Sequence, residues 1–133
     1  MAPTVTPALR KCLHVIGQIS GGDGLVTTAQ VARCLRISQP SATGLFRRLQ
    51  TLDLVRYQRY RGAELTDSGR SLVQAIERRQ HLLQQLLIRT LALSTGDALA
   101  EAGRLEPGVS NQLEARIVAL LAERGDGESS TYS

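Results

Sequence analysis

The chain has 133 residues, 42% of them hydrophobic and 3% aromatic, which predicts one domain with an aliphatic core and an appendage. It has no apolar run long enough to span a bilayer and no secretory signal, so we expect a cytoplasmic protein without membrane contact. It also has no nucleophile–base arrangement, phosphate-cradling glycine loop or paired-histidine metal motif, so an enzyme is not expected.

The net charge of +4 is unevenly distributed along the chain. Residues 1–75 hold ten Lys or Arg against four Asp or Glu, whereas residues 76–133 hold six against eight. A concentration of positive charge in one half indicates contact with phosphate groups. We therefore expect the first half to bind double-stranded DNA, and charges that only solvate a surface are the alternative.

Helical spacing of apolar residues begins near the N-terminus. It predicts a first helix over residues 8–19, which the glycine-rich run at 20–24 ends. A second helix is expected over 28–35 and a third over 39–52, with Ser38 or Gln39 as its cap and Pro40 in its first turn.

Two short strand candidates follow, over 54–57 and 63–65. Between them, residues 58–62 form a basic tip whose glycine can turn the chain. Two helices joined by a short turn and followed by a basic hairpin are typical of a winged helix-turn-helix.

Three more helices are expected in the second half, over 67–91, over 94–106 and after a cap at Ser110, with a disordered tail over 125–133. Their apolar stripes, which include Leu99, Leu105 and Leu113, exceed what about fifty residues can bury alone. We therefore expect the chain to pair with a second copy of itself as a homodimer.

The sequence thus predicts a mainly α fold, in which a winged helix-turn-helix DNA-binding domain is followed by an all-helical dimerisation domain. We expect the DNA-binding domain over 1–75, the dimerisation domain over 76–124 and the tail over 125–133.

The third helix is expected to enter the major groove of DNA, with a basic hairpin tip beside it. Its exposed polar residues would lie nearest the bases, and its arginines and N-terminus would hold phosphates. The candidate DNA-binding residues are Ser38, Gln39, Ser41, Thr43, Gly44, Arg47, Arg48, Arg59 and Arg61.

The two cysteines, Cys12 and Cys34, lack CxxC spacing, so we expect reduced thiols that pack as small hydrophobic side chains. A redox switch is the less favoured reading.

Short phrases spread along the chain carry a family resemblance. They are Val31-Ala32, Ser38-Gln39-Pro40-Ser41, Leu54-Val55, Tyr60-Arg61-Gly62, Leu65-Thr66-Asp67-Ser68-Gly69, Arg104-Leu105-Glu106 and Val109-Ser110. With them the sequence resembles the iron- and manganese-dependent repressors of the diphtheria toxin repressor/manganese transport regulator (DtxR/MntR) family. The likeness covers about residues 10–123, and the run at 101–106 makes it more specific than the winged helix alone, which MarR-like proteins share. It implies a homodimeric transcription regulator, usually a repressor, of the short two-domain type.

The resemblance also implies a divalent metal site, and the sequence departs from the family there. Of the family's ligand positions, only Glu106 is retained, and His14 is a chemically able substitute. Two ligands fall short of a tight site. The ligand positions fall on Lys11, His14, Gln80, Gln84, Leu99, Gly103, Glu106 and Pro107.

These departures predict a degenerate metal site and a protein that needs no cofactor. In place of the ion, we expect the ammonium of Lys11 to pair with the carboxylate of Glu106. The expected function is a DNA-binding regulator, a repressor acting as a homodimer on a palindromic operator without the usual metal activation. A manganese- or iron-dependent repressor with an altered site, a MarR-like ligand- or redox-responsive regulator, and a dimerisation module without DNA binding are the alternatives.

Overall fold

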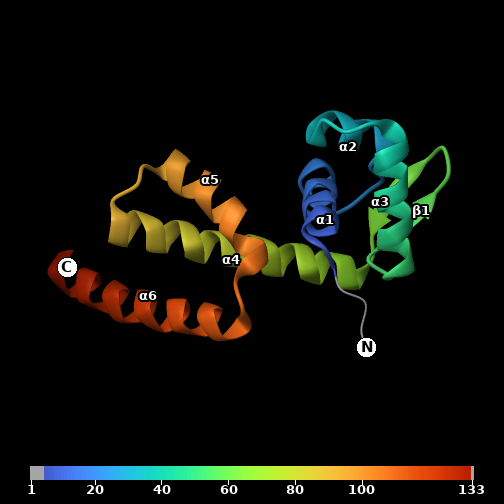
Figure 1. Ribbon diagram of the computed structural model, residues 1–133. Helices are drawn as coiled ribbons and strands as arrows, with labels where there is room; N and C mark the ends of the chain where they lie inside the picture. Colours follow the sequence, from blue (N-terminus) through green and yellow to red (C-terminus); the bar gives the residue numbers. More distant parts are fainter. Residues whose placement is uncertain (1–4, 133) are drawn as a thin grey trace. The chain divides into compact units, whose positions relative to one another are not determined.

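The computed structural model describes the backbone of residues 5–132 and the side chains of residues 5–123. The chain divides into two units, residues 1–75 and residues 76–133 (Figure 1). The elements are mainly helices with one two-stranded antiparallel sheet. The predicted fold class is confirmed.

Three helices build the first unit: α1 (Pro7–Ser20), α2 (Thr28–Leu35) and α3 (Gln39–Thr51). Each begins where a hydroxyl side chain accepts a hydrogen bond from a backbone N–H of the first turn. This satisfies a donor that the helix itself leaves unpaired. The capping side chains are those of Thr6, Thr27 and Ser38.

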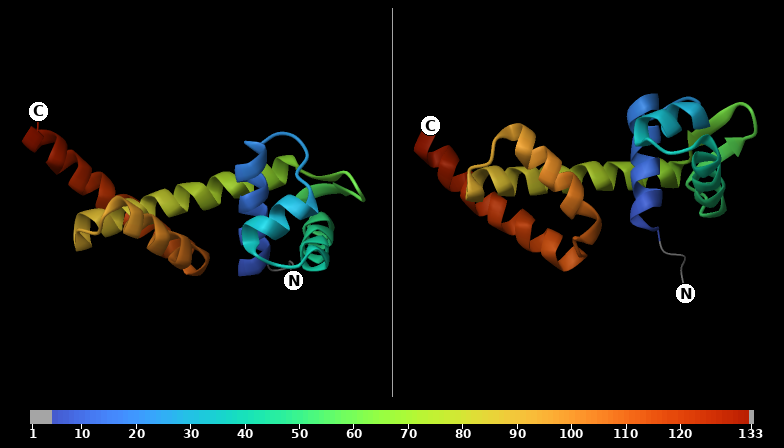
Figure 2. Two further views of the ribbon diagram at one scale, coloured as in Figure 1. Left: turned by 90° about the horizontal axis from the view of Figure 1, so that it is seen from above. Right: turned by 45° about the horizontal axis from the view of Figure 1, so that its top comes forward.

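A hairpin follows α3, formed by β1 (Val55–Gln58) and β2 (Gly62–Leu65). Val26 forms a bridge to Ala63, which ties the hairpin to the segment before α2. Gly62 has φ +119°, and a Cβ there would lie 2.5 Å from the carbonyl oxygen of Val26. Only glycine fits such a position, so this residue fixes where the tip turns. The tip projects away from the helices in the views of Figures 1 and 2.

The core of the first unit is aliphatic around a single phenylalanine, Phe46. The ring of Phe46 is fully buried and meets the Tyr57 ring edge-to-face, with centroids 5.6 Å apart. Helices α1, α2 and α3 and both strands contribute to this cluster, so the surface of α3 that faces away from it is held in a fixed orientation. The buried residues are Leu9, Cys12, Leu13, Val15, Ile16, Val26, Val31, Phe46, Leu49, Leu54, Val55, Ala63, Leu65 and Val73.

Helix α4 (Asp67–Leu91) spans the boundary between the units, and its C-terminal part belongs to the second. There α5 (Thr95–Leu105), the short 3₁₀ helix η1 (Glu106–Gly108) and α6 (Asn111–Tyr132) complete the fold. Their small core consists of Leu83, Ala102, Val109, Ile117 and Leu121.

The apolar stripes of the second unit are only partly covered within one chain, as their size predicts. Leu99, Leu105 and Leu113 are about half exposed, at 53%, 46% and 48%. One expectation for this unit differs from the structure: helix α6 continues to Tyr132, past the predicted start of a tail at residue 125. Residue 133 lies outside the described part of the chain.

No helix among the described residues is long and apolar enough to cross a membrane.

Candidate nucleic-acid interface

Helix α3 has one buried face and one polar, mostly exposed face. Ala42, Phe46 and Leu49 are buried on the core side. The opposite side carries all seven DNA-contact candidates predicted on or beside this helix, of which only Thr43 is partly covered. The other six, Ser38, Gln39, Ser41, Gly44, Arg47 and Arg48, are exposed.

The start of α3 is held by its cap. Ser38 Oγ accepts a hydrogen bond from the backbone N–H of Ser41 at 3.1 Å and donates to Ser41 Oγ at 2.8 Å. These bonds fix the first turn and engage both hydroxyls, which reduces what either can offer a ligand. The positive end of the helix dipole lies at the same place and favours an anion there.

The hairpin tip carries the other two arginine candidates, Arg59 and Arg61, on either side of Tyr60. Tyr60 is 90% exposed and has φ +70°, and the guanidinium carbon of Arg59 lies 4.9 Å from the centre of its ring. A cation over an aromatic face is a favourable contact that holds the guanidinium near the tip.

The positive charge of this surface is not compensated within the described residues. Arg47, Arg48, Arg59 and Arg61 form no ion pair there with an acidic side chain. By contrast, the strand residue Arg56 pairs with Glu64, its cross-strand neighbour, at 3.3 Å. With no carboxylate beside them in the described part of the chain, the four guanidinium groups are available to phosphate.

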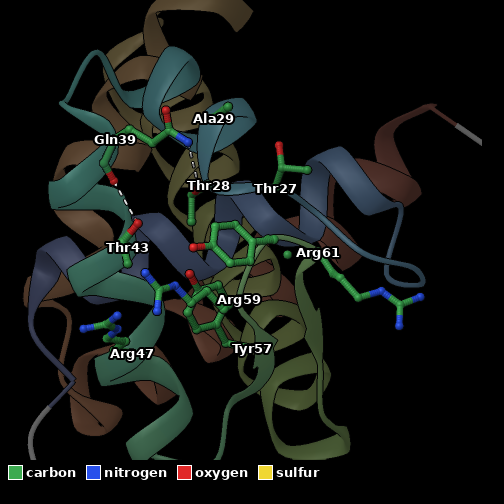
Figure 3. Close-up of a pocket in the computed structure, with 11 residues that line it drawn as sticks. Thr27, Thr28, Ala29, Gln39, Thr43, Arg47, Tyr57, Arg59 and Arg61 are labelled. Atoms are coloured by element: carbon green, nitrogen blue, oxygen red, sulfur yellow. Dashed lines mark hydrogen bonds between the residues drawn. The ribbon is translucent and has the colours of Figure 1, made fainter.

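A cleft of about 380 Å³ separates α3 from the hairpin (Figure 3). Arg47 reaches it from α3, and Arg59 and Arg61 from the tip; Figure 3 shows Arg61 extending away from the other two. Arg48 does not line it. The cleft is therefore lined by three predicted arginines, of which Arg47 and Arg59 lie near each other, and such a concentration of positive charge favours phosphate.

The start of α2 also lines this cleft, which the sequence analysis missed. Thr27, Thr28 and Ala29 form part of its wall, and Gln39 Nε2 donates a hydrogen bond to Thr28 Oγ1 at 3.3 Å. A helix-turn-helix brings the N-terminus of its first helix close to that of its second, a signal that could have identified Thr28.

In the second unit, Glu106 is only 2% exposed, and its carboxylate lies 3.7 Å from Arg79 Nη1. Arg79 also donates to the carbonyl oxygen of Val109 at 2.9 Å and to Asn111 Oδ1 at 3.1 Å. Arg79 thus joins α4 to the turn before α6, a role that the sequence analysis missed. Lys11 lies in the other unit, so the Lys11–Glu106 pair stays a prediction.

The ligand positions of the degenerate metal site offer few donor groups. The described part of the chain contains no group of three or more His, Cys, Asp or Glu side chains that could hold a metal ion. The retained Glu106 already has a guanidinium beside it. The residues present do not fit the tight site of transition ions, which needs more donors.

The two cysteines differ in their surroundings. Cys12 is buried in the core, and this burial raises the pKa of its thiol to about 12. Cys34 is exposed, so the expectation that both pack as hydrophobic side chains is wrong for Cys34. A short helix such as α2 has too few buried positions to cover it.

Comparison with known proteins covers almost the whole chain. Residues 2–63 match a family model described as the iron dependent repressor N-terminal DNA binding domain. Residues 66–125 match the iron dependent repressor metal binding and dimerisation domain.

Relatives and solved structures agree with these matches. The iron-dependent repressor IdeR of Mycobacterium tuberculosis is 33% identical over 93 residues, 70% of this chain and 40% of the relative. The diphtheria toxin repressor of Corynebacterium diphtheriae is 30% identical over 95 residues, 71% of this chain and 42% of the relative. A manganese-dependent transcriptional repressor in complex with manganese superimposes with a TM-score of 0.76 at 32% identity, over 86% of this chain and 52% of that one. The chain spans less than half the length of these curated relatives.

These comparisons correct the expectation that no cofactor is used. The matched second domain is described as metal binding, one relative is named as iron-dependent, and the solved repressor holds manganese. The expectation that the protein needs no cofactor was wrong because it considered the ligand positions alone.

Proposed function

The chain belongs to the iron-dependent repressor (DtxR/MntR) family, and on that premise we propose that it is a metal-responsive repressor that binds a palindromic DNA operator as a homodimer. That it is a transcription regulator of this family follows from the matches to both domains. The homodimer, the palindrome and the response to a metal ion are the further parts of the proposal.

The observation that carries the proposal is the arginine-lined cleft between α3 and the hairpin. With α3 in the major groove, Arg47 and Arg48 lie where they can hold the backbone on the helix side. Arg59 and Arg61 lie at the tip, where they can hold the backbone or a minor groove that flanks the site. These contacts need only the charges and orientation that the first unit provides.

The homodimer is supported by apolar surface in the second unit. Leu91 is 64% exposed and Leu99 is 53% exposed, and a hollow of about 580 Å³ is lined by several leucines. Burial of such surface against a second copy would remove apolar groups from water, which favours association. The leucines that line the hollow are Leu87, Leu91, Leu93 and Leu105.

The metal response is supported by the family and not by a donor set in this chain. When bound, a divalent iron or manganese ion would neutralise acidic groups. Of the sequence candidates, His14 lies in the first unit and Glu106 in the second. The described residues assemble no site for the ion, and the proposed DNA contacts use only side chains of the first unit.

The test is selection of bound sequences from random duplex DNA, followed by affinity measurements in chelator and in manganese(II) or iron(II). We expect a palindromic site and a higher affinity with metal. A protein that enriches no sequence under either condition contradicts DNA recognition. Equal affinity in chelator and in metal contradicts the metal response alone.

A further inference from the structure

The amide of Gln39 differs from the other polar groups on the exposed face of α3. It lies at the first residue of the helix, its side chain is exposed, and its Nε2 donates to Thr28 Oγ1 at 3.3 Å (Figure 3). Thr28 belongs to α2, so the bond joins the two helices of the helix-turn-helix. It restricts a side chain that would otherwise have several rotamers.

The neighbouring candidates are less able to read a base. Ser41 Oγ already accepts from Ser38, and the Thr43 hydroxyl donates to the carbonyl oxygen of Gln39 at 3.1 Å. Gly44 has no side chain, and a Cβ there would meet nothing within 4 Å. Of this group, Gln39 alone has a planar amide, which presents an N–H donor and an oxygen acceptor side by side, as a single hydroxyl cannot.

We propose that Gln39 is the base-reading residue of α3, that it reads an adenine in the major groove, and that Thr28 is its positioning residue. The proposal rests on the proposed DNA-binding function and specifies what that site recognises. It concerns only residues of the first unit.

The chemistry follows from the hydrogen-bonding groups of an amide. Gln39 has two N–H donors and one carbonyl oxygen, and Thr28 uses one donor. The remaining N–H and oxygen match the N7 acceptor and N6 donor that adenine presents side by side in the major groove. Guanine presents two acceptors there, which would place its O6 against the Gln39 oxygen. Adenine is therefore the base that satisfies both groups.

The surroundings of Gln39 favour close approach to a base pair. A shallow hollow of about 470 Å³ lies on the outer side of α3, lined by Gln39, Pro40, Thr43, Gly44 and Arg47. The missing side chain at Gly44 leaves room for the helix to lie deeper in the groove. Thr28 itself is held by the start of α2, where Thr27 and Gln30 form a capping box with bonds of 2.9 and 3.1 Å.

The test uses the full chain, random duplex DNA and manganese(II), with wild type and three variants. For Gln39→Ala we expect the adenine preference to vanish at one symmetric pair of positions, with preferences elsewhere retained. Its affinity for the wild-type site should fall roughly a hundredfold, because each of the two protomers loses one bidentate contact that contributes about tenfold. For Gln39→Glu we expect a shift from adenine to cytosine, because a carboxylate only accepts and cytosine offers its N4 donor.

Thr28→Val keeps the shape of the side chain and removes the acceptor. We expect it to weaken the adenine preference without changing the salt dependence of binding, because no charge is altered. Gln112→Ala, at an exposed glutamine of α6, is the matched control and should select the wild-type site. Circular dichroism of each variant checks that the helices are intact.

The outcomes separate this proposal from the one on which it rests. If wild type enriches no site, the proposed function is wrong, and this inference with it. If wild type enriches a site that both Gln39 variants select unchanged, Gln39 does not read a base, while the proposed function stands. If only Thr28→Val behaves as wild type, the positioning role of Thr28 is wrong.

Discussion

The two arginines of α3 offer a quantitative test of phosphate binding. Arg47 and Arg48 are exposed, form no ion pair within the described residues, and lie opposite the buried face of their helix. In the double variant Arg47→Ala/Arg48→Ala we expect weaker binding to all DNA sequences. The stability of the fold should change by less than about 0.5 kcal/mol for each exposed substitution.

The magnitude follows from the release of counterions. Each phosphate contact contributes about 0.9 to the slope of log K against log salt. The proposed homodimer carries two copies of each arginine, so the double variant loses four contacts and its slope falls by about 3.6. Between 50 and 200 mM salt, wild type should therefore lose roughly 150 times more affinity than the variant. Fluorescence anisotropy with a labelled duplex measures this ratio.

A matched control removes a charge away from the interface. Arg116→Ala alters an exposed arginine of α6 in the second unit and should retain the wild-type slope. An unchanged slope in Arg47→Ala/Arg48→Ala would refute the placement of both guanidinium groups on phosphates. An equal fall in the control would show that net charge, and not position, determines binding.

Four further predictions concern other parts of the molecule. A footprint of Arg59→Ala/Arg61→Ala should lose protection at the outer edges of the site, and loss at its centre would contradict the placement of the hairpin tip. Leu99→Asp should shift the protein from dimer to monomer in analytical ultracentrifugation, because a carboxylate would replace an apolar contact; an unchanged dimer would exclude this surface. Iodoacetamide at pH 8 should alkylate Cys34 and leave Cys12 unmodified. Mass spectrometry measures which thiol is alkylated, and alkylation of Cys12 with Cys34 unmodified would contradict the prediction. Because the pKa of the Cys12 thiol is raised in the folded state, its contribution to stability is present below about pH 9 and should be lost as the pH rises towards about 12.

The first unit could be predicted closely because local signals agree with the tertiary fold. Residues 28–35 show helical spacing between a threonine cap and a change of pattern, and α2 has these bounds. Ser38 and Pro40 predict the start of α3, and Gly62 predicts the turn of the hairpin. Capping groups and glycine act on the backbone within a few residues, so the sequence alone carries this information.

The second unit was harder to predict, because its structure depends on contacts between residues that are far apart in the sequence and on surfaces that one chain does not cover. The spacing of Leu99 and the other leucines predicts more apolar surface than one chain can bury, but it does not predict which of these side chains stay exposed. Arg79 contacts Val109 and Asn111, some thirty residues away, and no local pattern predicts such a pairing. The Thr28–Gln39 bond was missed for the same reason, although the helix-turn-helix that brings the two together was predicted.

Hydrogen–deuterium exchange of the full chain, with and without its selected duplex, would test whether the cleft between α3 and the hairpin binds DNA. We predict slower exchange on DNA binding at the start of α3 and at the hairpin tip, residues 58–62. Amides covered by a phosphate backbone exchange less, and those of α5 should change little. Protection confined to α5 and α6, with the start of α3 and the tip unaffected, would contradict the proposed DNA interface.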